Sequence, residues 1–64
     1  MATIMINVSR WLILARSDED PEMEVVCFIW RGRADAGIAR AQRDALEHGE
    51  EDLKHFWAEP YDDN

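Results

Sequence analysis

Two histidines, one cysteine and fourteen carboxylates are the side chains of this 64-residue chain most able to carry chemistry. His48 and His55 stand seven positions apart, with Glu50, Glu51 and Asp52 between them. Histidine and carboxylate groups bind zinc, but this spacing is neither that of a short zinc finger nor an i, i+4 pair on a helix. We therefore interpret both histidines as surface residues, and the sequence predicts no metal and no cofactor.

Nucleophilic catalysis is equally weakly indicated. Cys27 lies inside an apolar run, where a thiol is usually buried and inert. Ser9 and Ser17 lack the glycine-rich turn that exposes a catalytic serine. Gly32 and Gly37 are isolated, so the sequence has no glycine-rich phosphate loop. These observations predict that the protein is not an enzyme.

The charge of the chain narrows the choice of partner. The formal net charge is −7, and the acidic residues gather in segments 18–24, 47–52 and 59–63. Such a surface repels nucleic-acid phosphate and anionic lipid, and it favours a basic protein partner or serves solubility alone. Four arginines surround the expected helix, and nearby acids favour ion pairs over a phosphate site. These arginines are Arg31, Arg33, Arg40 and Arg43, and the acids are Asp35, Asp44 and Glu47.

Segment 24–30 (EVVCFIW) is the densest β-branched and aromatic run, and the other elements must be arranged around it. It is short and lies between Pro21 and Gly32, which predicts a strand. Regular alternation places Met23, Val25, Cys27 and Ile29 on one face and Val26, Phe28 and Trp30 on the other. Both faces are apolar, so we expect cover on both sides, or on one side by a second chain.

Extended structure is also predicted before this strand. Segment 3–16 alternates and then becomes continuously apolar, which indicates a long first strand with a bend near Ser9 and Arg10. The polar segment 17–22 predicts a turn that joins the two strands as an antiparallel hairpin.

A helix is predicted over 36–48, with Asp35 as its N-cap and Gly49 in the left-handed conformation that ends it. Its expected apolar stripe consists of Ala34, Ile38, Ala41, Ala45 and Leu46. Segment 53–59 is ambiguous: a strand that returns beside the first is favoured, and a short helix is the alternative. Residues 59–64 form an acidic, frayed tail in this interpretation.

The elements together predict one small α+β domain over residues 1–64: an antiparallel hairpin with one covering helix, in the order ββαβ. A core this small is marginal, and a single cysteine excludes an internal disulfide, so we expect a homo-oligomer, most simply a dimer. The N-terminus lacks the pattern of a signal peptide and no apolar run reaches the length of a membrane helix, which predicts a cytoplasmic protein without membrane contact.

Function is predicted at the level of a class. Size, charge and exposed apolar strands favour a non-enzymatic protein. It would bind a basic surface on another macromolecule and thereby block that macromolecule. In size and charge alone, the chain resembles phage-encoded inhibitors such as anti-CRISPR proteins, which occupy nucleic-acid grooves. The alternative is a homo-oligomeric ligand-binding protein or enzyme with a histidine and carboxylate site at its interface. The candidate partner-binding residues are Asp18, Glu19, Asp20, Glu22, Glu50, Glu51, Asp52, Trp11, Trp30 and Trp57.

Overall fold

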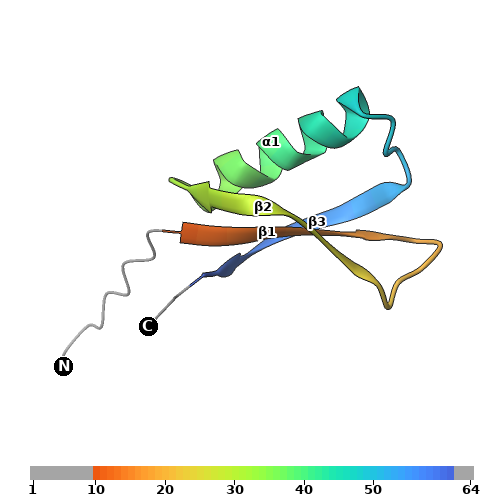
Figure 1. The fold of residues 1–64 in the computed structure, drawn as a ribbon, viewed down its shortest axis with the longest axis horizontal. Coiled ribbons are helices and arrows are strands. Elements are labelled where there is room, and N and C mark those ends of the chain that lie inside the picture. The colour runs from red at the N-terminus through yellow and green to blue at the C-terminus, as the bar shows by residue number, and fades with distance from the viewer. Residues whose placement is uncertain (1–9, 62–64) are drawn as a thin grey trace.

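The computed structural model describes residues 10–61 as a three-stranded antiparallel sheet with one helix on one face (Figure 1). The elements are β1 (Arg10–Ser17), β2 (Glu24–Arg31), α1 (Ala34–Glu47) and β3 (Leu53–Pro60). This confirms the predicted α+β class and the order ββαβ. The part of the first strand expected over 3–9, its bend near Ser9 and the end of the tail at 62–64 lie outside the described residues.

Strand β1 is the centre of the sheet, whose order is β2-β1-β3. Its neighbours are both antiparallel: Ile13 lies opposite Phe28 of β2 and Ala58 of β3. Ile13 and Ala15 are fully buried, because the central strand is flanked on both sides and covered by the helix. The predicted return of the third strand beside the first is therefore confirmed.

Strand β2 contains one extra residue, which changes the predicted faces. Ile13 pairs with Phe28 whereas Leu14 pairs with Val26, so Cys27 has no opposite residue on β1 and forms a bulge. Beyond the bulge the alternation is reversed. The helix side receives Val25, Cys27, Phe28 and Trp30, and the other side receives Glu24, Val26, Ile29 and Arg31. The predicted grouping of Ile29 with Val25 and of Val26 with Phe28 was wrong, because it assumed an unbroken period of two.

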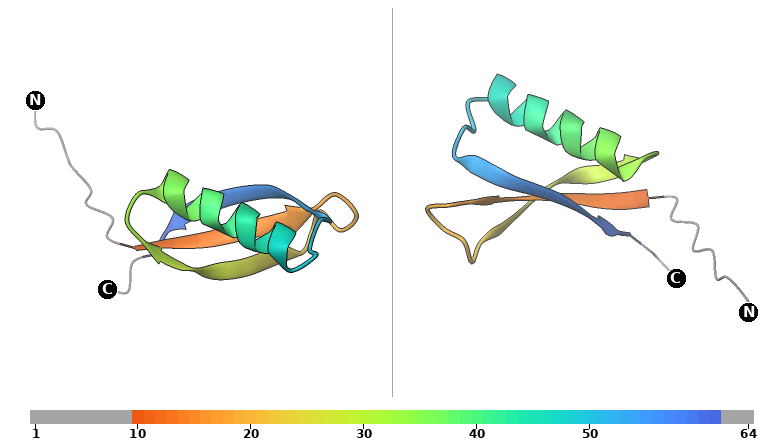
Figure 2. Two further views of the ribbon diagram at one scale, coloured as in Figure 1. Left: turned by 90° about the horizontal axis from the view of Figure 1, so that it is seen from above. Right: turned by 180° about the vertical axis from the view of Figure 1, so that it is seen from behind.

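Helix α1 lies across the sheet between the outer strands when seen from above (Figure 2). Its buried residues are Gly37, Ala41 and Ala45, so a seam of small residues faces the sheet. A Cβ atom on Gly37 would lie 2.7 Å from Trp30 Cγ and 3.0 Å from Ile13 Cδ1, so the helix approaches the sheet closely only because this residue is glycine. Leu46 was expected on the apolar stripe, but it is 68% exposed and lies at the rim of a groove that Leu53 and Phe56 of the third strand also line.

The two ends of α1 differ from their sequence predictions by one or two residues. The N-cap is Arg33 rather than Asp35, which lies in the first turn, where its Oδ1 accepts a hydrogen bond from the Ala36 N–H at 2.9 Å. Asp35 therefore still supplies a carboxylate to the helix N-terminus, where negative charge is favourable. At the other end Gly49 has φ +73°, as its left-handed role predicted.

Strand β3 settles the ambiguous segment as a strand, and the short-helix alternative is wrong. Pro60 is its last residue, a place where a missing N–H does not interrupt the ladder. Within residues 10–61, the one helix has 14 residues and is too short and too polar to cross a bilayer.

Candidate partner-binding surfaces

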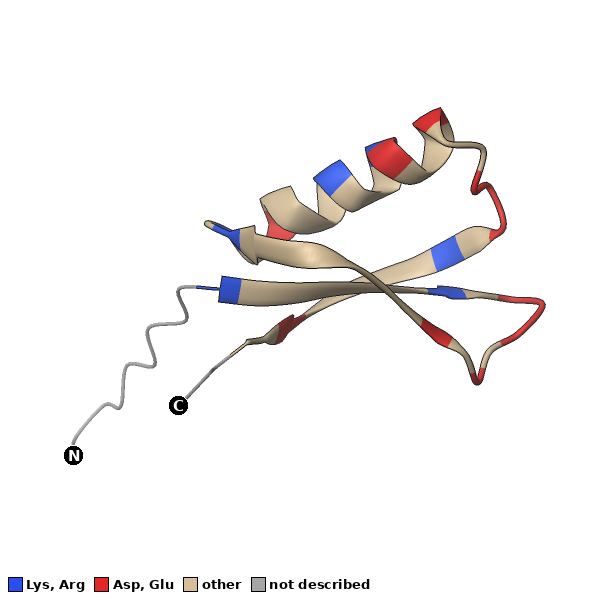
Figure 3. Cartoon of the chain, in the orientation of Figure 1, with Lys and Arg blue, Asp and Glu red and all other residues tan. Residues whose placement is uncertain are grey.

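Two acidic turns lie at the same end of the molecule, the right-hand end in Figure 3. One is the β1–β2 turn at 18–22, and the other is the α1–β3 connection at 50–52. The topology requires this meeting: the chain runs out along β1, returns along β2 and runs out again along α1, so both turns fall where β1 ends. Seven exposed carboxylates form this acidic end: Asp18, Glu19, Asp20, Glu22, Glu50, Glu51 and Asp52.

Hydrogen bonds hold the β1–β2 turn. The Glu19 N–H donates to Ser17 Oγ at 3.1 Å, and the Met23 N–H donates to the Asp20 carbonyl at 3.2 Å. His55 of β3 reaches the same turn, with its Nε2 at 2.6 Å from Asp18 Oδ1. The turn is therefore tied to the outer strand of the sheet and presents its remaining carboxylates to solvent.

Charge is balanced on the helix and unbalanced at the acidic end. On α1, Arg40 pairs with Asp44 and Arg43 pairs with Glu47, while Arg33 pairs with the first-turn acid Asp35. Three of the four arginines named around the helix therefore meet the predicted acids, whereas Arg31 has no ion pair within residues 10–61. Of the seven carboxylates at the acidic end, only that of Asp18 has an ion-pair partner within residues 10–61, and that partner is a histidine. A basic partner would therefore meet charges that the fold leaves uncompensated.

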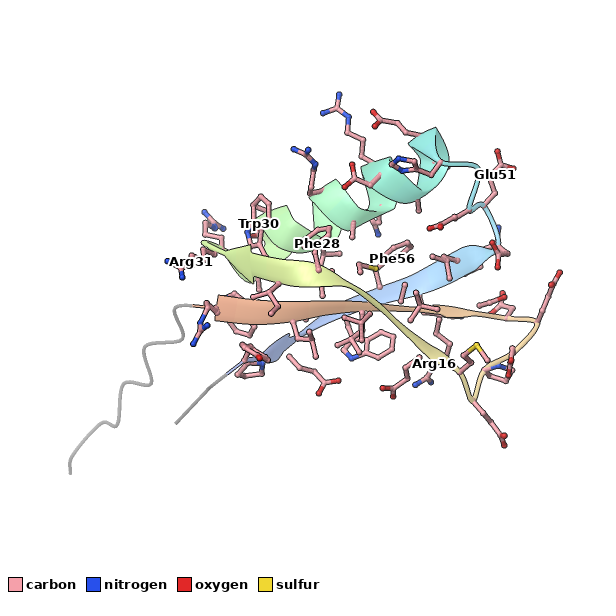
Figure 4. The ribbon with its side chains drawn as sticks, viewed as in Figure 1. Arg16, Phe28, Trp30, Arg31, Glu51 and Phe56 are labelled. Atoms are coloured by element: carbon pink, nitrogen blue, oxygen red, sulfur yellow. The ribbon has the colours of Figure 1, made fainter. Side chains whose placement is uncertain are left out.

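The sheet face opposite the helix is a second exposed surface, which we call the open face. Its centre is Leu14, only 3% exposed, with Val26 and Trp57 as its cross-strand neighbours. Arg16 stacks over the Trp57 ring, with its Cζ 5.1 Å from the ring centroid, and also pairs with Glu24 at 3.3 Å. In Figure 4 Arg16 lies on this side of the sheet, whereas the labelled aromatic residues lie on the helix side. The open face thus combines an apolar centre with a charged margin.

The three tryptophans are not brought together. Trp11 and Trp30 are paired across β1 and β2, and Trp30 packs under the helix near Gly37. Trp57 is on the open face, where its Nε1–H donates to Glu59 at 2.8 Å. All three are half-buried, so part of each ring packs against one of the two faces of the sheet. Only Trp57 is placed to contribute to a partner surface on the open face.

Four titratable groups lie around a groove between β2 and the end of α1. Cys27, Asp44, His48 and Glu50 are among the residues that line it. Burial raises the pKa of the Cys27 thiol, and the negative charges of Glu50 and Asp44 raise it further. His48 Nδ1 lies 2.8 Å from the Asp44 carbonyl oxygen and caps the helix rather than facing His55. This arrangement keeps the cysteine a neutral thiol.

Metal ligation finds no support in the part of the chain that the structure describes. Residues 10–61 contain no group of three histidine, cysteine or carboxylate side chains placed to hold a metal ion. The two histidines have separate partners, one in the helix and one in the β1–β2 turn.

The comparisons with known proteins found no similar protein or family. No protein-family model matches the chain, and neither the search of curated proteins nor that of solved structures found a match.

Sequence reasoning missed the exposed apolar residues of β2. Val26 and Ile29 are 58% and 48% exposed, and both lie on the open face because of the bulge at Cys27. All seven residues from 24 to 30 except Glu24 are apolar, so residue type gives no sign of where the alternation changes. Met23, which directly precedes the strand, is also 60% exposed.

Proposed function

We propose that this protein is a non-enzymatic binding module that occupies a basic surface of another macromolecule through its acidic end. The observation that carries the proposal is the meeting of two acidic turns, about thirty residues apart in sequence, at one end of the fold (Figure 3). The helix neutralises its own acids with arginine, so the charge available to a partner is concentrated in these turns.

Blocking is the action that this charge distribution favours. A basic groove that binds nucleic acid is lined by side chains that attract phosphate, and a cluster of carboxylates competes for the same side chains. Complementary charge accelerates association more than it strengthens the final complex. An acidic end held by a rigid sheet therefore suits an inhibitor that must reach its target before the nucleic acid does.

The decisive experiment removes charge from one turn. The variant replaces Asp18, Glu19 and Asp20 together by serine, and the probe is a lysine- and arginine-rich peptide. Association is measured at low, physiological and high ionic strength. We expect the association rate to fall about tenfold at low ionic strength, with a flatter salt dependence, because steering by opposite charge is lost.

A matched control separates local from net charge. Replacing Asp35 and Asp44 by asparagine and Glu47 by glutamine changes the net charge by the same amount on the helix. If both triple variants slow association equally, the acidic turns act only through net charge and serve solubility.

Blocking is measured in a separate experiment with a basic DNA-binding protein bound to duplex DNA. We expect the parent chain to release the DNA and the serine variant not to release it.

A further inference from the structure

The outer edge of β2 is an apolar strand edge without a neighbour. In the order β2-β1-β3, one side of β2 faces no other strand within residues 10–61. Val26 and Ile29 are about half exposed along it. An edge of this kind exposes unpaired backbone N–H and C=O groups and is the ordinary starting point for strand pairing between chains.

The burial pattern of β2 is the same in both directions. From Glu24 to Arg31 it runs exposed, intermediate, exposed, intermediate, intermediate, exposed, intermediate, exposed. The centre of this symmetry lies between Cys27 and Phe28, where the bulge reverses the alternation. The side chains on the two faces are therefore arranged symmetrically about one point in the middle of the strand.

This symmetry matters because two identical antiparallel strands must match face to face. Residues directly opposite each other in an antiparallel pair point to the same face of the sheet. In a regular strand a two-fold axis can pair only residues separated by an even number of positions, since odd separations lie on opposite faces. The bulge removes this restriction in β2, so Glu24 and Arg31, seven positions apart, are on the same face.

We propose that two copies of the chain pair through β2, antiparallel, about a two-fold axis between Cys27 and Phe28. Glu24 then lies opposite Arg31 of the second copy, and Val26 lies opposite Ile29 of the second copy. Arg31 has no ion pair within residues 10–61, and Glu24 shares its carboxylate with Arg16 while remaining half exposed. The register brings opposite charges together at both ends and joins two β-branched pairs in between.

The bulge does not protect this edge in the way that bulges usually do. A bulge ordinarily bends an edge strand so that a second chain cannot follow it. Here the symmetry axis passes through the bulge, so the two distortions meet at one place and the outer pairs keep their register. The product is a six-stranded sheet with both helices on one side and a continuous open face on the other.

The other edge of the sheet lacks these features. Strand β3 ends at Pro60, which has no N–H to donate, and its exposed residues include Lys54 and Glu59. Proline and charge on an edge oppose strand addition. The burial pattern of β3 is not symmetric, so a two-fold axis has no favoured position along it.

Charge reversal tests the register directly. Glu24→Arg and Arg31→Glu each place like charges opposite one another twice in the dimer, whereas the double variant restores opposite charges. Sedimentation across a range of concentrations should show a dimer for the parent chain. Each single reversal should weaken dimerisation about tenfold, and the double variant should recover most of it.

A second pair of variants tests the apolar part of the edge. Ile29→Lys introduces a charge on the edge and should give a monomer, while the matched control Leu46→Lys makes the same kind of change at an exposed helix position and should leave the dimer intact. Both residues are exposed, so folding should survive, and circular dichroism checks this.

Three results would overturn the proposal. These are a parent chain that is monomeric at all concentrations, a dimer that survives both single charge reversals, and a double variant that fails to recover while still folded. Nuclear Overhauser contacts between Val26 and Ile29 of differently labelled copies give an independent check. The dimer extends beyond the proposed binding of a basic partner, and the serine variant of the acidic turn should dimerise normally, so either idea can fail without the other.

Discussion

The two faces of one sheet are buried by different means. On the covered face Ile13 and Ala15 have no exposed surface, because a helix with a seam of small residues lies directly over them. On the open face only Leu14 is buried among residues 10–61, and its cover comes from side chains of the sheet itself. The comparison teaches that a chain of this length completes one core and leaves the second face for other contacts.

The largest expected effect tests the covered face. Ile13→Ala removes buried methyl and methylene groups beneath the helix, where close packing leaves little room for relaxation. We expect the free energy of unfolding to fall by about 3 kcal/mol. Urea denaturation followed by circular dichroism measures it. A loss below about 1 kcal/mol would mean that the helix does not hold this face closed.

Trp57→Ala tests the cover of Leu14 on the open face. The ring stacks with Arg16 and its N–H binds Glu59, so truncation removes the cover of Leu14 and both of these interactions. Since the ring is only half-buried, we expect a loss of about 2 kcal/mol, less than a fully buried tryptophan costs. Trp57→Phe, which keeps most of the ring, should retain more than half of this stability. Equal losses in the two variants would show that the N–H bond to Glu59 dominates.

Gly37→Ala tests the close approach of the helix. Helix propensity alone predicts a gain of about 1 kcal/mol, whereas contact with Trp30 and Ile13 predicts a loss of about 1–3 kcal/mol. We expect a net loss of about 1 kcal/mol, measured by urea denaturation. The control Ala39→Gly, at an exposed helix position, measures the propensity term by itself. A stabilised Gly37→Ala variant would show that the helix can move away from the sheet without cost.

Several parts of this arrangement could be predicted from the sequence. The polar turn and the left-handed Gly49 each have a local signal in residue type, whereas the third strand was favoured over a short helix because it could return beside the first strand. The meeting of the two acidic turns also follows from the sequence, because the order ββαβ places both at the end where the first strand stops. The candidate residues in these turns therefore lie together, while the candidate tryptophans are divided between the two faces.

The bulge at Cys27 could not be predicted, and the physical reason is specific. Periodicity reveals the faces of a strand only when polar and apolar residues alternate, and 24–30 is apolar on both sides. The position of the extra residue is set by pairing with β1, which the composition of 24–30 does not encode. The role of Gly37 in letting the helix approach the sheet could not be predicted for a related reason. It depends on the Trp30 ring, which lies between the helix and the sheet.

Ile29→Ala repeats the first substitution on the open face. About half of Ile29 is exposed in the single chain. We therefore expect the free energy of unfolding at high dilution to fall by only about 0.5 kcal/mol. The same substitution should weaken self-association measurably, since Val26 of the second copy loses its neighbour. Urea denaturation at low concentration and sedimentation at high concentration separate the two effects. If Ile29→Ala at high dilution lowered the free energy of unfolding as much as Ile13→Ala does, the two faces of the sheet would not differ in how they are buried.

The smallest effect concerns Cys27 and appears only in alkaline solution. Burial on the helix side, together with Glu50 and Asp44, raises the pKa of the thiol in the folded chain, while the unfolded chain keeps the ordinary value of about 8.5. The neutral thiol is thus favoured by folding. Its contribution to stability is complete below the unfolded pKa and is lost as pH rises through the folded pKa, because the unfolded chain then releases a proton that the folded chain retains. Unfolding free energies of the parent and of Cys27→Ala, measured from neutral to alkaline pH, should therefore differ in slope, with the parent falling more steeply. Parallel curves would show that Cys27 is as well solvated in the folded chain as in the unfolded one, and the helix side of β2 would then be open to water at the bulge.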